Sequence, residues 1–160
     1  MNGLSELITV AHRWRDWSDP RFVVLVLNNG DLAEVSWEQR EMEGEPVFTA
    51  SQDLPYFPYA GYAELLGLRG IRVDDPAQIG TAWDAALSAD RPVVIEVLTD
   101  RATPLLAPFP AGRAKLETMR AGLAQEEAAG RHARRLLDVY ADQEEALWTR
   151  GLGGPTGERF

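Results

Sequence analysis

The segment Arg21–Asp31, RFVVLVLNNGD, constrains the fold of this chain more than any other. It begins with an apolar, valine-rich run, Phe22–Leu27, that lacks polar alternation and is too short to span a membrane. Such a run is typical of a strand buried on both faces of a parallel sheet. The run stops at two asparagines, a glycine and an aspartate, and open parallel sheets bind ligands at the carboxyl ends of their strands. The segment therefore predicts an α/β fold with a ligand-binding crevice after this strand.

The residues after the strand decide between a hairpin and a helix. The dipeptide Asn29-Gly30 is a strong hairpin signal. However, the apolar residues that follow do not alternate with polar ones as a second strand would (Leu32, Val35 and Trp37). Asp31 followed by Glu34 resembles a helix-capping pair. We therefore predict a strand, a tight loop and a helix capped by Asp31, whose N-terminal N–H groups suit a phosphate.

Helix and strand patterns alternate through the rest of the first hundred residues. Helices are predicted over 2–14, from Pro58 to Gly67, and from the Asp75-Pro76 start signal through Leu87. Strands are predicted at Ile71–Val73 and, strongly, at Pro92–Leu98, whereas 38–52 is predicted to be a loop or a short helix. This order predicts a three-layer α/β/α architecture: a partial, doubly wound parallel sheet with helices on both faces.

The character of the sequence changes after Ala102. Thr103–Pro110 is proline-rich, and two weakly periodic helices are predicted around Arg113–Gln125 and Arg131–Arg150. The predicted organisation is a first domain over 1–105, a helical tail over 106–150, and a glycine-rich segment, 151–160, that is disordered.

Composition excludes several classes of function. A net charge of −9 in 160 residues argues against binding to a nucleic-acid backbone, so an anionic ligand would need a metal or helix N-termini to neutralise it. The chain has no cysteine, which excludes thiolate chemistry and suits a reducing cytoplasm, the expected location. No membrane span or signal peptide is predicted. Because His12 and His132 lie far apart, no catalytic residue set is predicted.

Five motifs in succession carry a family resemblance. They are NGLSEL, VLVLNNGDL, VSWEQR, YAELLGLRGIRV and RPVVIEVLTD. In this order and spacing they resemble the diphosphate-binding domain of thiamine diphosphate (thiamine pyrophosphate)-dependent enzymes, in the group of pyruvate oxidase and the acetolactate synthase large subunit. The resemblance covers Asn2 to about Leu105 and implies a thiamine-diphosphate-binding fold. The tail beyond Leu106 resembles no family.

The resemblance implies roles for particular residues. In the family, the second asparagine of the pair and a carbonyl two residues later bind Mg²⁺, which corresponds here to Asn29 and Asp31. Oxygen ligands of this kind suit Mg²⁺, and Gly30 would let the backbone turn sharply between them. The cofactor-binding set becomes Asn28, Asn29, Gly30, Asp31 and Leu32. Trp37 and Glu38 correspond to positions of the family's substrate pocket, although packing is the common role of such a tryptophan.

Some parts of the family's site do not occur in this sequence. The Gly-Asp-Gly triplet, whose aspartate binds the metal, is absent and would fall just before Met1 by family spacing. The pyrimidine-binding domain with the activating glutamate, and the middle domain that carries FAD in oxidases, are also absent. The chain is thus expected to be an N-terminally truncated fragment, inactive alone. The complete enzyme would decarboxylate a 2-oxo acid such as pyruvate and transfer the resulting enamine to an acceptor.

Two other functions remain open from the sequence. A truncated relative could serve as a non-catalytic interaction module that pairs with a partner chain or a second copy, because the apolar strand would then lie at an exposed edge. The partner chain would supply the pyrimidine-binding domain. An unrelated flavodoxin-like domain is the third possibility.

Overall fold

The protein forms two compact units in a computed structural model that describes residues 4–104 and 112–149. The first, here called the sheet unit, comprises Met1–Asn29 and Pro55–Thr99. The second, the helical unit, comprises Gly30–Leu54 and Asp100–Phe160. The backbone therefore passes between the units after Asn29, after Leu54 and after Thr99.

The sheet unit is built on three parallel strands. They are β1 (Val23–Asn28), β2 (Arg69–Val73) and β3 (Val93–Leu98), in the order β1-β3-β2. Val26 and Ile71 pair with Glu96 and Ile95 of the central strand β3, respectively. The two strongly apolar sequence runs form adjacent strands, which confirms the predicted parallel sheet.

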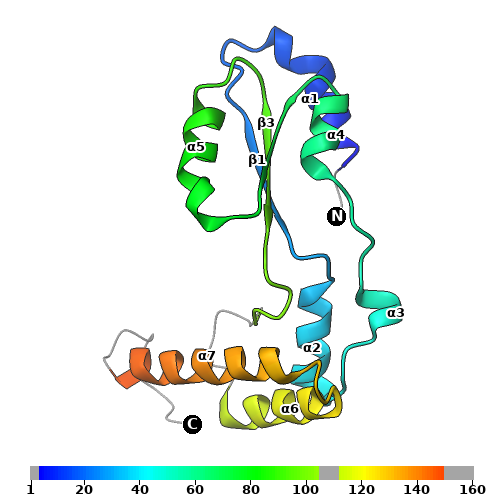
Figure 1. Ribbon diagram of the computed structural model, residues 1–160, viewed down its shortest axis with the longest axis vertical. Coiled ribbons are helices and arrows are strands. Elements are labelled where there is room, and N and C mark those ends of the chain that lie inside the picture. The colour runs from blue at the N-terminus through cyan, green and yellow to red at the C-terminus, as the bar shows by residue number, and fades with distance from the viewer. Residues whose placement is uncertain (1–3, 105–111, 150–160) are drawn as a thin grey trace. The chain divides into compact units, whose positions relative to one another are not determined.

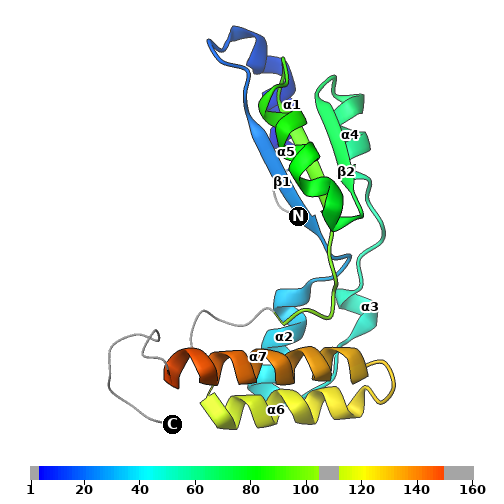
Figure 2. The same ribbon diagram turned by 60° about the vertical axis from the view of Figure 1, so that its left-hand side comes forward.

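Helices cover both faces of this sheet, as Figures 1 and 2 show. On one face, α1 (Glu6–Arg13) and α4 (Tyr59–Leu65) pack around a core of Leu7, Val26, Ala63, Leu68 and Val94. On the other, α5 (Ile79–Leu87) packs around Val73, Ala82, Ala86, Ala89, Val93 and Ile95. Short 3₁₀ turns follow α1 at Trp14–Asp16 and precede α5 at Pro76–Gln78, where the Asp75 carboxylate accepts the Ala77 N–H. The three-layer α/β/α prediction is confirmed.

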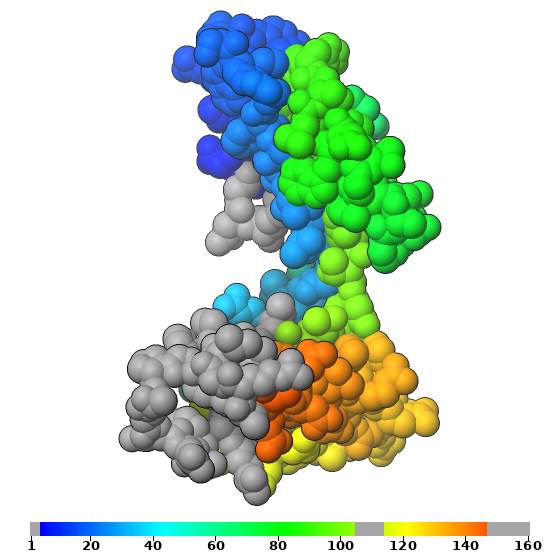
Figure 3. All heavy atoms as spheres, turned by 90° about the vertical axis from the view of Figure 1, so that its left-hand side faces the viewer, coloured from blue at the N-terminus to red at the C-terminus, as the bar shows by residue number. Residues whose placement is uncertain are grey.

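The prediction that β1 is buried on both faces is wrong. Val26 is 8% exposed, but Leu25 and Leu27, which point to the opposite face, are 42% and 64% exposed. The reason is position: among the described strands, β1 lies at the edge of the sheet, and α5 packs on the β2 and β3 side of that face. Figure 3 shows β1 in blue at the surface beside the green α5.

The helical unit contains four helices, α2 (Ala33–Glu43), α3 (Thr49–Gln52), α6 (Gly112–Gln125) and α7 (Arg131–Thr149), among its described residues. Its core joins Trp37 of α2 to Met119, Leu123 and Leu137 of α6 and α7, and Figure 2 shows α6 and α7 lying side by side. Both predicted tail helices are confirmed. The segment 38–52 was predicted to be a loop or a short helix. It holds the end of α2, which continues to Glu43 before Gly44 ends it at φ +69°, and then a loop and the short helix α3.

A buried ion pair ties α2 to the turn between α6 and α7. Arg40 Nε and Nη2 donate to the two carboxylate oxygens of Glu126 over 2.8 and 3.1 Å, and each side chain is 8% exposed. Glu126 also accepts the Val47 N–H at 2.9 Å, and the Arg40 guanidinium lies 4.7 Å from the Trp37 ring centroid. A bidentate pair of this kind tolerates burial because both carboxylate oxygens and two guanidinium nitrogens are hydrogen-bonded.

The predicted domain boundary near residue 105 stays a prediction, and 151–160, predicted to be disordered, lies outside the described residues. The compact units group 30–54 with residues after Asp100 rather than with the sheet. Among the described residues, no helix has the length and apolar character needed to cross a membrane.

Shortening Leu137 should destabilise the helical unit. Its side chain is fully buried in the core, so Leu137→Ala should lower the free energy of unfolding by about 2–5 kcal/mol. Val139→Ala, in the same helix but 48% exposed, should change it by less than about 0.5 kcal/mol. Urea denaturation followed by circular dichroism measures both, and equal losses would contradict this core assignment.

Candidate functional site

The loop Asn28–Leu32 crosses from one unit to the other, so its two parts are described separately. Asn28 is the last residue of β1, and Asn28 and Asn29 are half-buried. Gly30 has φ +64°, a conformation that residues with a side chain rarely adopt, although a Cβ there would meet no atom within 4 Å. Glycine is therefore favoured here by the backbone conformation and not by lack of space.

In the sheet unit, a buried acid holds the end of β1. Glu96 of β3 is fully buried, and its carboxylate accepts the Asn28 Nδ2 at 2.7 Å and the Ala60 N–H at 3.1 Å. The Thr99 N–H donates to the Asn28 carbonyl at 3.0 Å. The Asn28 side chain thus presents its NH₂ group to Glu96. The sequence reasoning missed Glu96, although an acid inside the apolar run PVVIEVL was a usable signal.

In the helical unit, residues 30–32 of the loop pair with residues 52–54. The Leu54 N–H donates to the Gly30 carbonyl and the Leu32 N–H to the Gln52 carbonyl, both at 2.9 Å. Asp31 and Asp53 form an antiparallel bridge between these bonds. The Gln52 side chain is buried and satisfied: it accepts the Phe48 N–H and the Ser36 hydroxyl, and it donates to Gln39.

The predicted role of Asp31 as a helix cap is wrong. Leu32 occupies the cap position of α2, which has no side-chain cap hydrogen bond. The bridge to Asp53 keeps the backbone extended through Asp31, so the helix begins two residues later. The Asp31 side chain, 6% exposed, instead forms an ion pair with Arg101, and the Ser36 hydroxyl lies 3.4 Å from its Oδ2.

The two predicted substrate-pocket residues lie in different surroundings. Trp37 is 1% exposed and belongs to the core of the helical unit. Its neighbour Glu38 is exposed. Of the two, only Glu38 offers its side chain to a small molecule at the surface.

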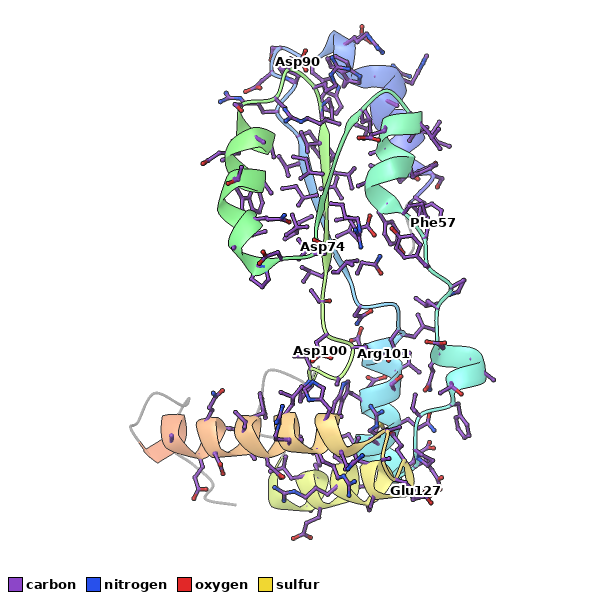
Figure 4. All side chains as sticks on the ribbon, viewed as in Figure 1. Phe57, Asp74, Asp90, Asp100, Arg101 and Glu127 are labelled. Atoms are coloured by element: carbon purple, nitrogen blue, oxygen red, sulfur yellow. The ribbon has the colours of Figure 1, made fainter. Side chains whose placement is uncertain are left out.

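The loop after β3 carries two charged residues, Asp100 and Arg101, labelled in Figure 4. The Asp100 carboxylate accepts the Ala102 N–H at 2.9 Å and lies 2.6 Å from His132 Nε2 at the start of α7. The Ala102 hydrogen bond, followed by that of His132, lowers the pKa of Asp100 below its ordinary value. The ionised carboxylate therefore favours the folded state.

The oxygen donors of the loop suit a hard cation such as Mg²⁺, which prefers amide, carbonyl and phosphate oxygens. Among the described residues, no group of three or more histidines or acids is placed to hold a metal. The described part of the loop therefore offers neutral amide and carbonyl oxygens to such a cation, without an acidic cluster beside them.

Removing the Glu96 carboxylate should destabilise the sheet unit. Glu96→Ala leaves the Asn28 amide and the Ala60 N–H without their acceptor, and each buried donor costs about 1–3 kcal/mol. We expect a loss of roughly 2–6 kcal/mol in the free energy of unfolding. The control Glu64→Ala, at an exposed position of α4, should change it by less than about 0.5 kcal/mol. Similar values for both variants in urea denaturation would contradict the role assigned to Glu96.

At low pH, Asp100 should contribute less to the free energy of unfolding. A lowered pKa means that the unfolded chain takes up the proton first, so the stabilisation is full above the ordinary carboxyl pKa of about 4 and is lost as the pH falls below it. The difference in unfolding free energy between the protein and Asp100→Asn should therefore shrink from about pH 6 to about pH 3. A difference that stays constant with pH would refute this.

Residues 1–97 match the family described as "Thiamine pyrophosphate enzyme, C-terminal TPP binding domain". The chain is 33% identical over 92 residues to "Putative thiamine pyrophosphate-containing protein YdaP" of Bacillus subtilis (strain 168), covering 58% of this chain and 16% of that protein. It is 29% identical over 119 residues to "Acetolactate synthase catalytic subunit, mitochondrial" of Aspergillus candidus, covering 68% and 17%. No solved structure gives a significant match. The match over 1–97, with its parallel sheet and NNGD loop, shows that the chain belongs to the C-terminal TPP-binding domain family of thiamine pyrophosphate enzymes.

Proposed function

We propose that this chain is the diphosphate-binding portion of an enzyme that decarboxylates a 2-oxo acid such as pyruvate and transfers the remaining fragment to an acceptor. The observation that carries the proposal is the Asn28–Leu32 loop, which leaves the carboxyl end of β1 with Gly30 at positive φ. That strand end is where an open parallel sheet binds its ligand. Because the chain spans 16% and 17% of the two relatives, the complete reaction requires groups that these 160 residues do not provide.

The residues of the loop have different roles in binding the cofactor. Asn29 through its side-chain oxygen and Asp31 through its carbonyl would hold Mg²⁺, which would neutralise charge on the diphosphate. The main chain around this metal site takes its shape from Asn28, Gly30 and Leu32. Bound thiamine diphosphate supplies the electron sink for breaking the bond next to the substrate carbonyl. The exposed Glu38 contacts the substrate, and Trp37 supports it from the core. FAD takes part only in a full-length system.

The isolated chain holds the cofactor without turnover. It contains no Gly-Asp-Gly triplet to supply the charged metal ligand. A partner chain brings the pyrimidine-binding domain with its activating glutamate.

A second candidate, a non-catalytic interaction module, is favoured by one observation. The apolar edge strand β1 exposes Leu25 and Leu27, and an exposed edge is a site for pairing with another chain. Such a module would associate through β1 whether or not the cofactor is present.

Asn29 should control cofactor binding. Asn29→Ala should weaken binding of thiamine diphosphate with Mg²⁺ by at least about tenfold, the factor that corresponds to about 1.4 kcal/mol. Gln143→Ala removes an exposed side-chain amide from α7 and should leave the affinity unchanged. Isothermal titration calorimetry measures both.

Three results would decide between these proposals. Equal affinity for Asn29→Ala and the unmodified protein would refute the assigned ligand. Release of carbon dioxide from pyruvate by the isolated chain would refute the proposed inactivity. Absence of binding by a stably self-associated protein would favour the interaction module.

A further inference from the structure

Arg101 connects two carboxylates that face each other in the helical unit. Its Nη1 lies 2.8 Å from Asp53 Oδ1, and its Nη2 lies 3.5 Å from Asp31 Oδ1. Arg101 belongs to the loop that follows β3, and Figure 4 shows it beside the beginning of α2. One guanidinium therefore serves both residues of the Asp31–Asp53 bridge.

Electrostatics makes this cation necessary. Like charges at directly opposed positions of paired strands repel each other, and Asp31 and Asp53 occupy such positions. The Asp31 side chain is also only 6% exposed, and a buried carboxylate is costly unless it is paired and hydrogen-bonded. The planar fork of arginine can neutralise two carboxylates at once, which the point charge of a lysine does less well.

Burial indicates which of the two contacts matters more. Arg101 and Asp53 are 48% and 53% exposed, and ion pairs at this exposure contribute little to stability. Loss of the cation has its main effect at Asp31, because this carboxylate is only 6% exposed and would be buried without its cation. The main chain of Asp31 lies between two hydrogen bonds, Leu54 N–H to the Gly30 carbonyl and Leu32 N–H to the Gln52 carbonyl.

We propose that Arg101 is a positioning residue for the cofactor loop. By neutralising Asp31 and Asp53 it holds the segment 30–32 against the segment 52–54, and it thereby fixes the main-chain carbonyl of Asp31. We call this contact of Arg101 with both Asp31 and Asp53 the clamp. Its effect on the metal rests on the proposed function, in which the Asp31 carbonyl binds Mg²⁺. The clamp itself is a property of the protein without cofactor.

Hydrogen exchange of the full chain tests the clamp without any cofactor. Arg101→Gln should accelerate exchange of the Leu32 and Leu54 amides on the order of tenfold, because the buried Asp31 carboxylate loses its cation. Arg101→Lys should keep part of the protection. Adding Asp53→Asn to Arg101→Gln should restore part of it, because the repulsion across the bridge is gone. Unchanged exchange in Arg101→Gln, or no recovery in the double variant, would overturn the clamp.

The matched control is Arg72→Gln in the sheet unit. Arg72 is 46% exposed and pairs with Asp74, so this change removes an ion pair of similar exposure elsewhere in the chain. It should leave exchange at Leu32 and Leu54 unchanged. Exchange at the buried Leu137 reports whether each variant keeps the helical core. Equal acceleration at Leu32 and Leu54 in the Arg72 control would overturn the assignment to Arg101.

Cofactor titration tests the second step. Thiamine diphosphate with Mg²⁺ should bind Arg101→Gln about tenfold more weakly than the unmodified protein, with partial recovery in the double variant. If Arg101→Gln exchanges faster but binds the cofactor equally well, the link to the metal is overturned. If the unmodified protein does not bind the cofactor, the proposed function fails, and the exchange result alone decides the clamp.

Discussion

The parallel pairing of β3 with both neighbouring strands is the interaction on which the sheet unit depends. Every residue from Val93 to Glu96 is buried, and each side of the strand hydrogen-bonds to a different segment of the chain. β3 also carries Glu96, which binds the last residue of β1 and the first turn of α4. The strand therefore sets the sheet register and fixes the point at which β1 gives way to the NNGD loop.

Local sequence patterns predicted most of the elements. The apolar runs around Leu25 and Ile95 identified two adjacent strands, and the Asp75-Pro76 signal marked the turn before α5. The burial of β1 was not predictable in the same way, because it depends on what lies beside the strand. An apolar run shows that a strand can be buried, but it does not say whether a neighbour covers it.

Of the candidate site, only the residues of the NNGD motif could be predicted from the sequence. The loop residues 28–32 were identified by resemblance, and the positive φ of Gly30 agrees with the sharp turn expected there. The partners Glu96, Asp53 and Arg101 are distant in sequence from the loop, and of the three only Glu96 lies within one of the motifs. The cap assigned to Asp31 failed for this reason, since its actual partners come from segments that pair only in the folded chain.

The core around Trp37 includes residues that lie beyond the range of the family match. The match ends at residue 97, yet this tryptophan packs against Met119, Leu123 and Leu137. A polypeptide cut at residue 97 would keep α2 and expose its largest apolar side chain to water, and it would leave Arg40 without the carboxylate of Glu126. A fragment intended for biophysical work on the cofactor loop therefore has to extend through α7.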